Sequence, residues 1–239
     1  MRFIINIFQL ILVAFWCIFC AAFGVLVMLV TWNSKLTVYF IAVKVFSPVV
    51  LWLSGVKLKI EGRENINKDQ PFIYVANHES QLDIPVVCLA TELPLFFIAK
   101  KELRKIPIVG WYMIAVGHIF IDRSNKERAQ ASMIKAAEMI KGGKNVISFP
   151  EGTRNKDGKM NIFKRGSFVI AKRGNIGVVP IAIKGTREVL ASGSFMFHPG
   201  KVGVKIGTPV YPNEHPDLGI DDFANLLRNQ VIDLRNQLP

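Results

Sequence analysis

A histidine and an aspartate five positions apart, His78 and Asp83, follow a short β-forming run at 72–76. A carboxylate bonded to one imidazole nitrogen fixes the tautomer, which leaves the other nitrogen free to take a proton from a hydroxyl. On a regular helix these positions diverge by ~140°, so the side chains can meet only if His78 lies in a turn before a helix. The spacing indicates a general-base dyad at a strand end. A histidine that merely caps a turn is the alternative.

A second polar segment directly follows another β-forming run, at 145–149. Gly152 permits close backbone approach, and Thr153 offers a hydroxyl. Arg154 can bind phosphate oxygens through two parallel N–H groups, and Glu151 is placed to orient that guanidinium. The segment therefore suits a phosphate-binding loop, whereas a turn with a surface ion pair would use the same residue types.

Two further cations follow strand-like runs. Arg123 comes after 118–122, and Lys100 comes after 95–99. Because ligand sites in open α/β sheets lie at the carboxyl ends of strands, we expect both near the same sheet edge. Lys100 also opens a basic stretch that leads into the apolar segment 106–116. That juxtaposition suits a membrane surface with anionic headgroups, and a solvated charged face beside a core helix is the alternative.

The elements that must position these residues are short strands alternating with helices, which is the pattern of an α/β fold. We expect a mixed β-sheet flanked by helices, in one domain at 57–239. The strand-like runs are 56–60, 72–76, 95–99, 118–122, 145–149, 177–183 and 201–207. The apolar spacing predicts one helix that starts with a capping box at Ser124 and ends before Gly142, and a terminal helix at 220–234.

The N-terminal region, residues 1–56, reads as a membrane anchor. Positions 3–34 carry no charge, and this stretch is longer than the ~20 residues needed to cross hydrocarbon. A cleaved signal peptide is the alternative. A second apolar stretch at 36–56 contains Lys44 and Pro48. A lysine at mid-bilayer costs at least ~2.5 kcal/mol, which favours a helix at the interface over a second span. The two stretches form either a hairpin in one leaflet or a span plus an interfacial helix.

The composition and the absent motifs limit which binding partners and enzyme classes the chain fits. The chain has 30 basic and 18 acidic residues and a net charge of +12, which favours an anionic partner such as an acidic lipid surface. Cys17 and Cys20 lie in the apolar run and Cys88 stands alone, so we expect neither disulfides nor a metal site. The sequence lacks the G-x-S-x-G, Walker, G-x-G-x-x-G and H-E-x-x-H motifs of common hydrolases and nucleotide enzymes.

Together these segments resemble the glycerolipid acyltransferase family, most closely its bacterial 1-acyl-sn-glycerol-3-phosphate acyltransferases. The resemblance covers about 57–210 and rests on four blocks in family order: NHESQLD (77–83), GHIFIDR (117–123), FPEGTR (149–154) and VVPIAIKGTRE (178–188). It implies that His78 is the general base, that Asp83 orients it, and that no covalent acyl-enzyme forms. It also implies that Glu151, Gly152, Thr153 and Arg154 bind the glycerol phosphate, aided by Arg123 and Lys100.

The resemblance further implies the substrates and the compartment. The acceptor would be lysophosphatidic acid, the donor acyl-CoA or acyl carrier protein, and the product phosphatidic acid. No metal, cofactor or nucleic acid is expected. The enzyme would contact membrane phospholipids at the cytoplasmic face of a bacterial inner membrane. Backbone N–H groups near His78 are candidate donors to the thioester oxyanion. The alternatives are acylation of another lysophospholipid or an ornithine-type lysolipid, and a non-catalytic tether to anionic lipids.

Overall fold

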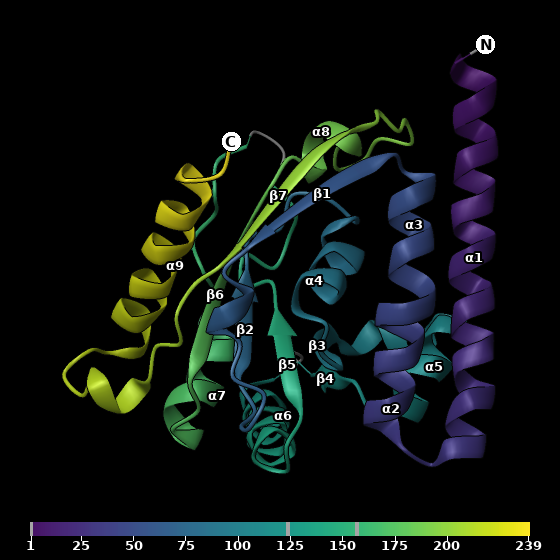
Figure 1. Cartoon of the computed structure of the whole chain (residues 1–239). Coiled ribbons are helices and arrows are strands. Elements are labelled where there is room, and N and C mark those ends of the chain that lie inside the picture. Colours follow the sequence, from purple (N-terminus) through teal and green to yellow (C-terminus); the bar gives the residue numbers. More distant parts are fainter. Residues whose placement is uncertain (1, 123–124, 156–157) are drawn as a thin grey trace.

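A computed structural model describes residues 2–122, 125–155 and 158–239 (Figure 1). The chain begins with two long helical segments that lie side by side and form the predicted hairpin. The first is α1 (Arg2–Thr31); the second runs through α2 (Ser34–Val38), the π-helical η1 (Tyr39–Phe46) and α3 (Ser47–Leu53). The side chain of Asn33 accepts the Leu36 N–H and caps α2.

Both helical segments, Phe3–Thr31 and Ser34–Leu53, are long and apolar enough to cross a membrane. The second segment is a continuous helix despite Lys44 and Pro48. Pro48 stands in the first turn of α3, where its missing N–H costs least. Lys44 is exposed, and its Nζ lies 5.4 Å from the centre of the Tyr39 ring.

A single mixed sheet contains all seven predicted strands. Its order is β1-β7-β6-β2-β5-β3-β4, and every neighbouring pair is parallel except the antiparallel pair β6 and β7. The strands are β1 (Val56–Glu61), β2 (Ile73–Ala76), β3 (Leu95–Lys100), β4 (Ile119–Ile121), β5 (Asn145–Ser148), β6 (Val178–Lys184) and β7 (Gly200–Ile206).

The remaining helices are α4 (Asp83–Thr91), α5 (Val109–Val116), α6 (Lys126–Lys141), α7 (Gly166–Gly174), α8 (Thr186–Val189) and α9 (Ile220–Asn236), with 3₁₀ turns η2 (Arg63–Asn65), η3 (Lys101–Lys105) and η4 (Pro212–Glu214). The helices predicted at 124–141 and 220–234 are therefore confirmed as α6 and α9. The side chain of Asn125 caps α6 by accepting the Arg128 N–H, whereas Ser124 lies outside the described residues.

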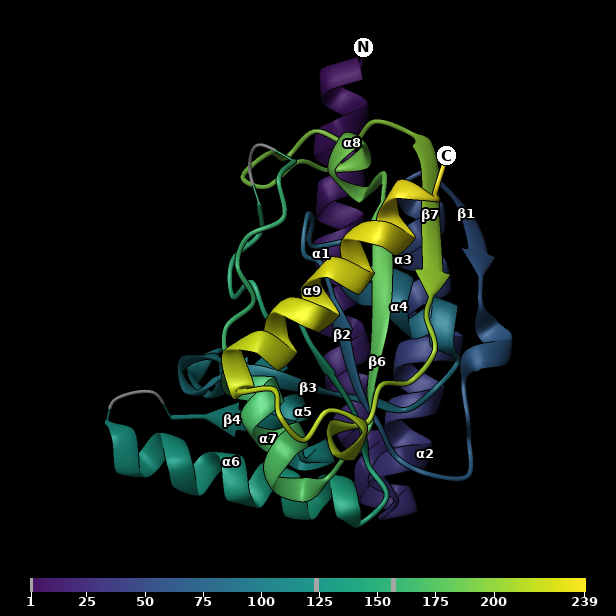
Figure 2. The ribbon, with the colours of Figure 1, turned by 90° about the vertical axis from the view of Figure 1, so that its left-hand side faces the viewer.

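Helices cover both faces of the sheet. Helices α6, α7 and α9 pack on one face, and α3 and α4 pack on the other, with α1 beyond them (Figures 1 and 2). Along the central strand β2, Ile73 and Val75 enter the first cluster, and Tyr74 and Ala76 enter the second. Burial on both faces explains why this strand reads as an unbroken apolar run.

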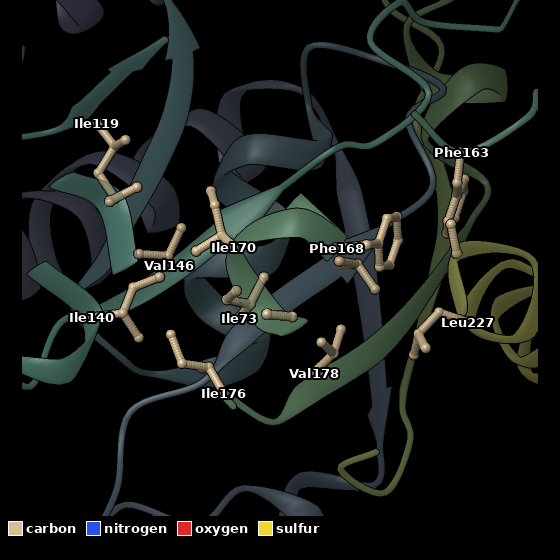
Figure 3. Close-up of a cluster of buried hydrophobic side chains, with 14 of the residues drawn as sticks. Ile73, Ile119, Ile140, Val146, Phe163, Phe168, Ile170, Ile176, Val178 and Leu227 are labelled. Atoms are coloured by element: carbon tan, nitrogen blue, oxygen red, sulfur yellow. The ribbon is translucent and has the colours of Figure 1, made fainter. Parts of the chain in front are cut away.

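The core on the α9 side joins strands to three helices. In Figure 3, the labelled strand residues Ile73, Val146 and Val178 lie among Ile140 of α6, Phe168 and Ile170 of α7, and Leu227 of α9. Strands β5, β2 and β6 are adjacent and parallel. Their carboxyl ends therefore meet at one edge, which brings together the loops that follow them.

Candidate active site

His78 and Asp83 meet at the carboxyl end of β2. His78 lies in the loop before α4, and Asp83 is the first residue of that helix. The distance between His78 Nδ1 and Asp83 Oδ2 is 2.7 Å. The histidine side chain is 18% exposed, whereas the aspartate is 0% exposed. The turn that the spacing requires is therefore present, and the ring keeps access to a ligand.

Several donors hold the Asp83 carboxylate. Its Oδ2 also accepts the backbone N–H groups of Glu79 (2.7 Å) and Ser80 (2.9 Å). Its Oδ1 accepts the Thr186 hydroxyl at 2.6 Å. A buried carboxylate needs such partners. Because an ionised carboxylate only accepts hydrogen bonds, His78 Nδ1–H donates to it, which leaves Nε2 as the accepting ring nitrogen. Sequence reasoning did not single out Thr186, although the fourth block contains it.

The loops after β2 and β5 bind each other through His78. Its ring stacks on Phe149, with centroids 4.3 Å apart and an interplanar angle of 18°. Its N–H donates to Glu151 Oε1 at 2.7 Å, and its C=O accepts the Asn155 N–H at 2.9 Å. The imidazole is thus fixed in orientation by the neighbouring loop as well as by Asp83.

The structure corrects two expectations about this region. Glu151 is buried, and its Oε2 accepts the Asn161 N–H at 2.8 Å, so both of its oxygens hold backbone groups and it does not orient Arg154. Burial also raises the pKa of its carboxyl. The backbone N–H groups of residues 78–80 all donate to Glu151 or Asp83, so they are not free for an oxyanion.

The other residues predicted for phosphate lie on the same side of the sheet edge. Gly152 has φ +75° and lines a cavity that also reaches His78. Thr153 is exposed, and Arg154 is half-buried without an ion-pair partner in the described part of the chain. Gly152 also leaves space for a cation that was not predicted for the site, because a Cβ there would lie 2.7 Å from Lys164 Nζ.

A second lysine joins Lys164 on the wall of this cavity. Lys164 and Lys100 both line it and are exposed. Lys100 ends β3, in register with Ile121 of β4. Arg123, predicted two positions beyond that strand, lies outside the described residues. Two of the described cations, Lys100 and Lys164, therefore line the same cavity as His78.

The cavity itself is apolar and measures about 730 Å³. One wall comes from the α/β domain, including Leu95 and Phe97. Another comes from the hairpin, including Cys20, Ile41 and Phe46. Sequence reasoning treated the hairpin only as an anchor, since apolar patterning does not separate residues that face lipid from those that line a cavity.

Burial shifts the pKa values of two other side chains on the cavity wall, His118 and Cys88, away from neutral pH. Burial lowers the pKa of His118 to about 3, and its Nδ1 accepts the Phe97 N–H at 3.0 Å. Burial raises the pKa of the Cys88 thiol to about 12. Among the described residues, no group of three or more His, Cys, Asp or Glu side chains could hold a metal ion. His78 lines the same cavity.

The chain is similar in sequence to several curated proteins. A relative from Saccharomyces cerevisiae, described as 1-acyl-sn-glycerol-3-phosphate acyltransferase, is 32% identical over 208 residues, which are 83% of this chain and 66% of the relative. The chloroplastic enzyme LPAT1 of Arabidopsis thaliana, with the same description, is 38% identical over 73% of this chain and 48% of its own. The chain spans about half to two thirds of the length of the first curated relatives it matches.

A solved structure agrees with the fold. The 1-acyl-sn-glycerophosphate (LPA) acyltransferase PlsC from Thermotoga maritima superposes with a TM-score of 0.81 at 31% sequence identity, covering 99% of this chain and 95% of that one. The family model described as Acyltransferase matches residues 57–184, which include His78, Asp83 and the loop after β5. This chain belongs to the acyltransferase family.

Proposed function

We propose that this protein transfers a fatty acyl group from acyl-CoA or acyl carrier protein to the sn-2 hydroxyl of 1-acyl-sn-glycerol-3-phosphate, which gives phosphatidic acid. The observation that carries the proposal is the His78–Asp83 dyad, with Nδ1 and Oδ2 2.7 Å apart and His78 on the wall of a large apolar cavity. A base beside an apolar cavity suits a reaction between a hydroxyl and a long acyl chain. The names of the relatives point to the same substrates.

The dyad supplies general-base catalysis. Asp83 holds the Nδ1 proton, so His78 Nε2 takes the hydroxyl proton as the acceptor oxygen attacks the thioester carbonyl carbon. The adduct then breaks the C–S bond, and the departing sulfur receives the proton from the imidazolium. The products are an ester and a free thiol, and His78 returns to its neutral form. The stack on Phe149 keeps the ring oriented throughout.

The acceptor's phosphate fits the cations around the opening. Arg154 has no ion-pair partner in the part of the chain that the structure describes, and Lys164 and Lys100 line the cavity. Charge-assisted hydrogen bonds to phosphate are among the stronger polar contacts in proteins. We assign phosphate binding to these groups together with Gly152 and Thr153. Glu151 supports them by tying the two loops together.

The hairpin would bring this site to the bilayer. Large apolar side chains are exposed along α1 and continue through Trp111 and Ile114 of α5. The α/β domain contacts α1 near both of its ends: Asn6 Oδ1 accepts the Phe197 N–H, and Gly24 packs under Tyr112. Because a polar domain lies along the helix, we favour insertion into one leaflet over a full span. We infer that the domain lies at the cytoplasmic face of a bacterial inner membrane, where it would meet water-soluble donors.

The test uses the full-length protein in detergent. It measures the free thiol that each donor releases when lysophosphatidic acid is added. Wild type is compared with His78→Ala and with His198→Ala, a control at an exposed histidine. We expect His78→Ala to lose about 10²- to 10⁴-fold in kcat, the usual size of a general-base contribution. The control should match wild type.

Each other outcome has a defined meaning. Wild-type silence with both donors would reject the lysophosphatidic acid assignment, and other lysophospholipids and ornithine-type lysolipids would then be assayed. Equal activity of His78→Ala and wild type would reject His78 as the base. Binding to anionic vesicles without acyl transfer to any acceptor would favour the membrane tether.

A further inference from the structure

Helix α9 presents a polar stripe to the active-site loops. Asp221, Arg228 and Arg235 are spaced seven residues apart, and such positions lie within ~20° of each other per step around a helix. The stripe runs beside the face that buries Phe223 and Leu227 against the sheet. Figure 2 shows α9 lying obliquely across one face of the sheet.

Arg228 holds the loop that follows β5. Its Nε donates to the Asn161 carbonyl at 2.9 Å, and its Nη2 donates to the Met160 carbonyl at 2.7 Å. The N–H of Asn161 donates in turn to Glu151, which accepts the His78 N–H. Two carbonyls bound by one guanidinium fix this segment relative to α9. Arg228 is therefore connected to His78 through Asn161 and Glu151.

Arg235 holds the loop that follows β2. Its Nε and Nη2 lie 2.9 Å and 2.7 Å from Glu79 Oε1, which also accepts the Asn77 side-chain N–H at 3.2 Å. Glu79 is 1% exposed, and its Oε2 has no hydrogen-bond partner within the described residues. Loss of one partner from a buried ion pair leaves an uncompensated charge, which is costly. The Glu79 N–H donates to Asp83, so displacement of Glu79 would disturb the dyad.

We propose that α9 clamps the active site at two points: Arg235 positions the His78–Asp83 loop through Glu79, and Arg228 positions the loop at 158–165 through its carbonyls. Both are positioning residues, and neither is assigned contact with substrate. The effect on rate rests on the proposed acyl transfer. The clamp also gives α9 a role beyond covering the sheet.

The charge on Glu79 supplies a pH signature of the Arg235 contact. The pKa of the Glu79 carboxyl is raised to about 7: burial is the largest cause, Asp83 and Glu188 also raise it, and Arg235 lowers it. Removal of Arg235 will raise this pKa and weaken the contacts of Glu79 at neutral pH. The acid limb of the kcat profile should therefore move to higher pH in Arg235→Ala. Arg228→Ala should leave the limb in place.

The experiment measures kcat, KM for lysophosphatidic acid and melting temperature for four variants and wild type. Because precise placement of reacting groups governs kcat, we expect Arg235→Ala to lower kcat roughly 10-fold with KM almost unchanged. Arg235→Lys should recover part of the loss. Because the loop after β5 carries phosphate-binding groups, Arg228→Ala should raise KM roughly 10-fold. Arg173→Ala, at an exposed arginine ending α7, is the control.

Wild-type kcat and an unshifted pH profile in Arg235→Ala would overturn the clamp. The clamp would also be overturned if activity fell to the same extent in both arginine variants and only in proportion to their lower melting temperatures. If wild type itself fails with lysophosphatidic acid, the proposed function fails, and hydrogen exchange decides the clamp separately. Faster exchange confined to 77–83 in Arg235→Ala and to 158–165 in Arg228→Ala would support it, and unchanged local exchange would overturn it.

Discussion

The two loops that meet at the carboxyl edge of the sheet differ in how their polar groups are satisfied. In the loop after β2, the Asp83 carboxylate, His78 Nδ1 and the backbone N–H groups of residues 78–80 have partners within the protein. In the loop after β5, Arg154 and Lys164 have no ion-pair partner in the described residues. The first loop is organised without a ligand. If the proposed function holds, the two cations of the second loop pair with the acceptor's phosphate.

This difference assigns a kinetic role to each loop. Interactions that are complete before binding, and that act on the reacting groups, affect kcat. Interactions completed only when the ligand arrives affect KM if they are equal in the ground state and the transition state. Substitutions in the loop after β2 should therefore lower kcat, and substitutions of the free cations should raise KM.

The largest expected effect is from Asp83→Asn. The Asp83 carboxylate accepts hydrogen bonds at both oxygens, from His78 Nδ1, two backbone N–H groups and the Thr186 hydroxyl. In an amide, one of these oxygens is replaced by an NH₂ group, which donates. His78 can then carry its proton on Nε2, which removes the nitrogen that would accept the hydroxyl proton. Loss of such an orienting carboxylate lowers kcat by up to about 10⁴-fold. The measurement is steady-state thiol release at saturating lysophosphatidic acid.

Thr186→Val sharpens this prediction, because it removes one donor from Asp83 Oδ1 and leaves the His78 contact in place. We expect roughly a 10-fold loss in kcat, which corresponds to one hydrogen bond to a charged group. Near wild-type kcat in Asp83→Asn would contradict the idea that this loop is organised for proton transfer.

The dyad could be predicted from sequence because its two members are close along the chain and follow a clear apolar strand. The partners that support it could not. Thr186 comes from the end of β6, and Phe149 and Glu151 come from the end of β5, so their contacts exist only once the strands are ordered in the sheet. Strand order depends on tertiary packing and not on local pattern.

The second effect concerns the unpaired cations. Arg154→Ala combined with Lys164→Ala should raise KM for lysophosphatidic acid by about 10- to 100-fold, since charge-assisted hydrogen bonds contribute about 1.5 to 3 kcal/mol. The kcat value should change little. The check is the same assay with the acceptor varied at a saturating donor concentration.

An acceptor without phosphate provides the control for these cations. With a monoacylglycerol, the double variant and wild type should have similar kcat/KM, because no phosphate is present to reach Arg154 or Lys164. An equal loss with both acceptors would show that the two cations support the fold of the loop and do not recognise phosphate.

The cavity and the clamp show why other parts of the site were beyond sequence analysis. Ile41 of the hairpin lines the cavity, but the apolar sequence pattern around it would be the same if this side chain faced lipid. On α9, the stripe of Asp221, Arg228 and Arg235 looks like an ordinary solvated helix face, since long polar side chains usually flank a buried stripe. Only the arrangement of the loops shows what the arginines bind.

The smallest effect separates the organisation of the first loop from its stability. Burial raises the pKa of Glu79 from 4.5 to about 7, so the folded state favours the neutral carboxyl. The corresponding stabilisation is present below pH 4.5 and is lost as pH rises through about 7. Glu79→Gln does not titrate. The melting temperature of this variant relative to wild type should therefore increase from pH 5 to pH 8, while its kcat at pH 8 falls because the Arg235 ion pair is lost.

The control is Glu138→Gln, at an exposed position on α6, which should show neither change. A constant melting-temperature difference between Glu79→Gln and wild type across this range would mean that Glu79 keeps one charge state throughout. In that case the loop after β2 would hold its geometry independently of pH.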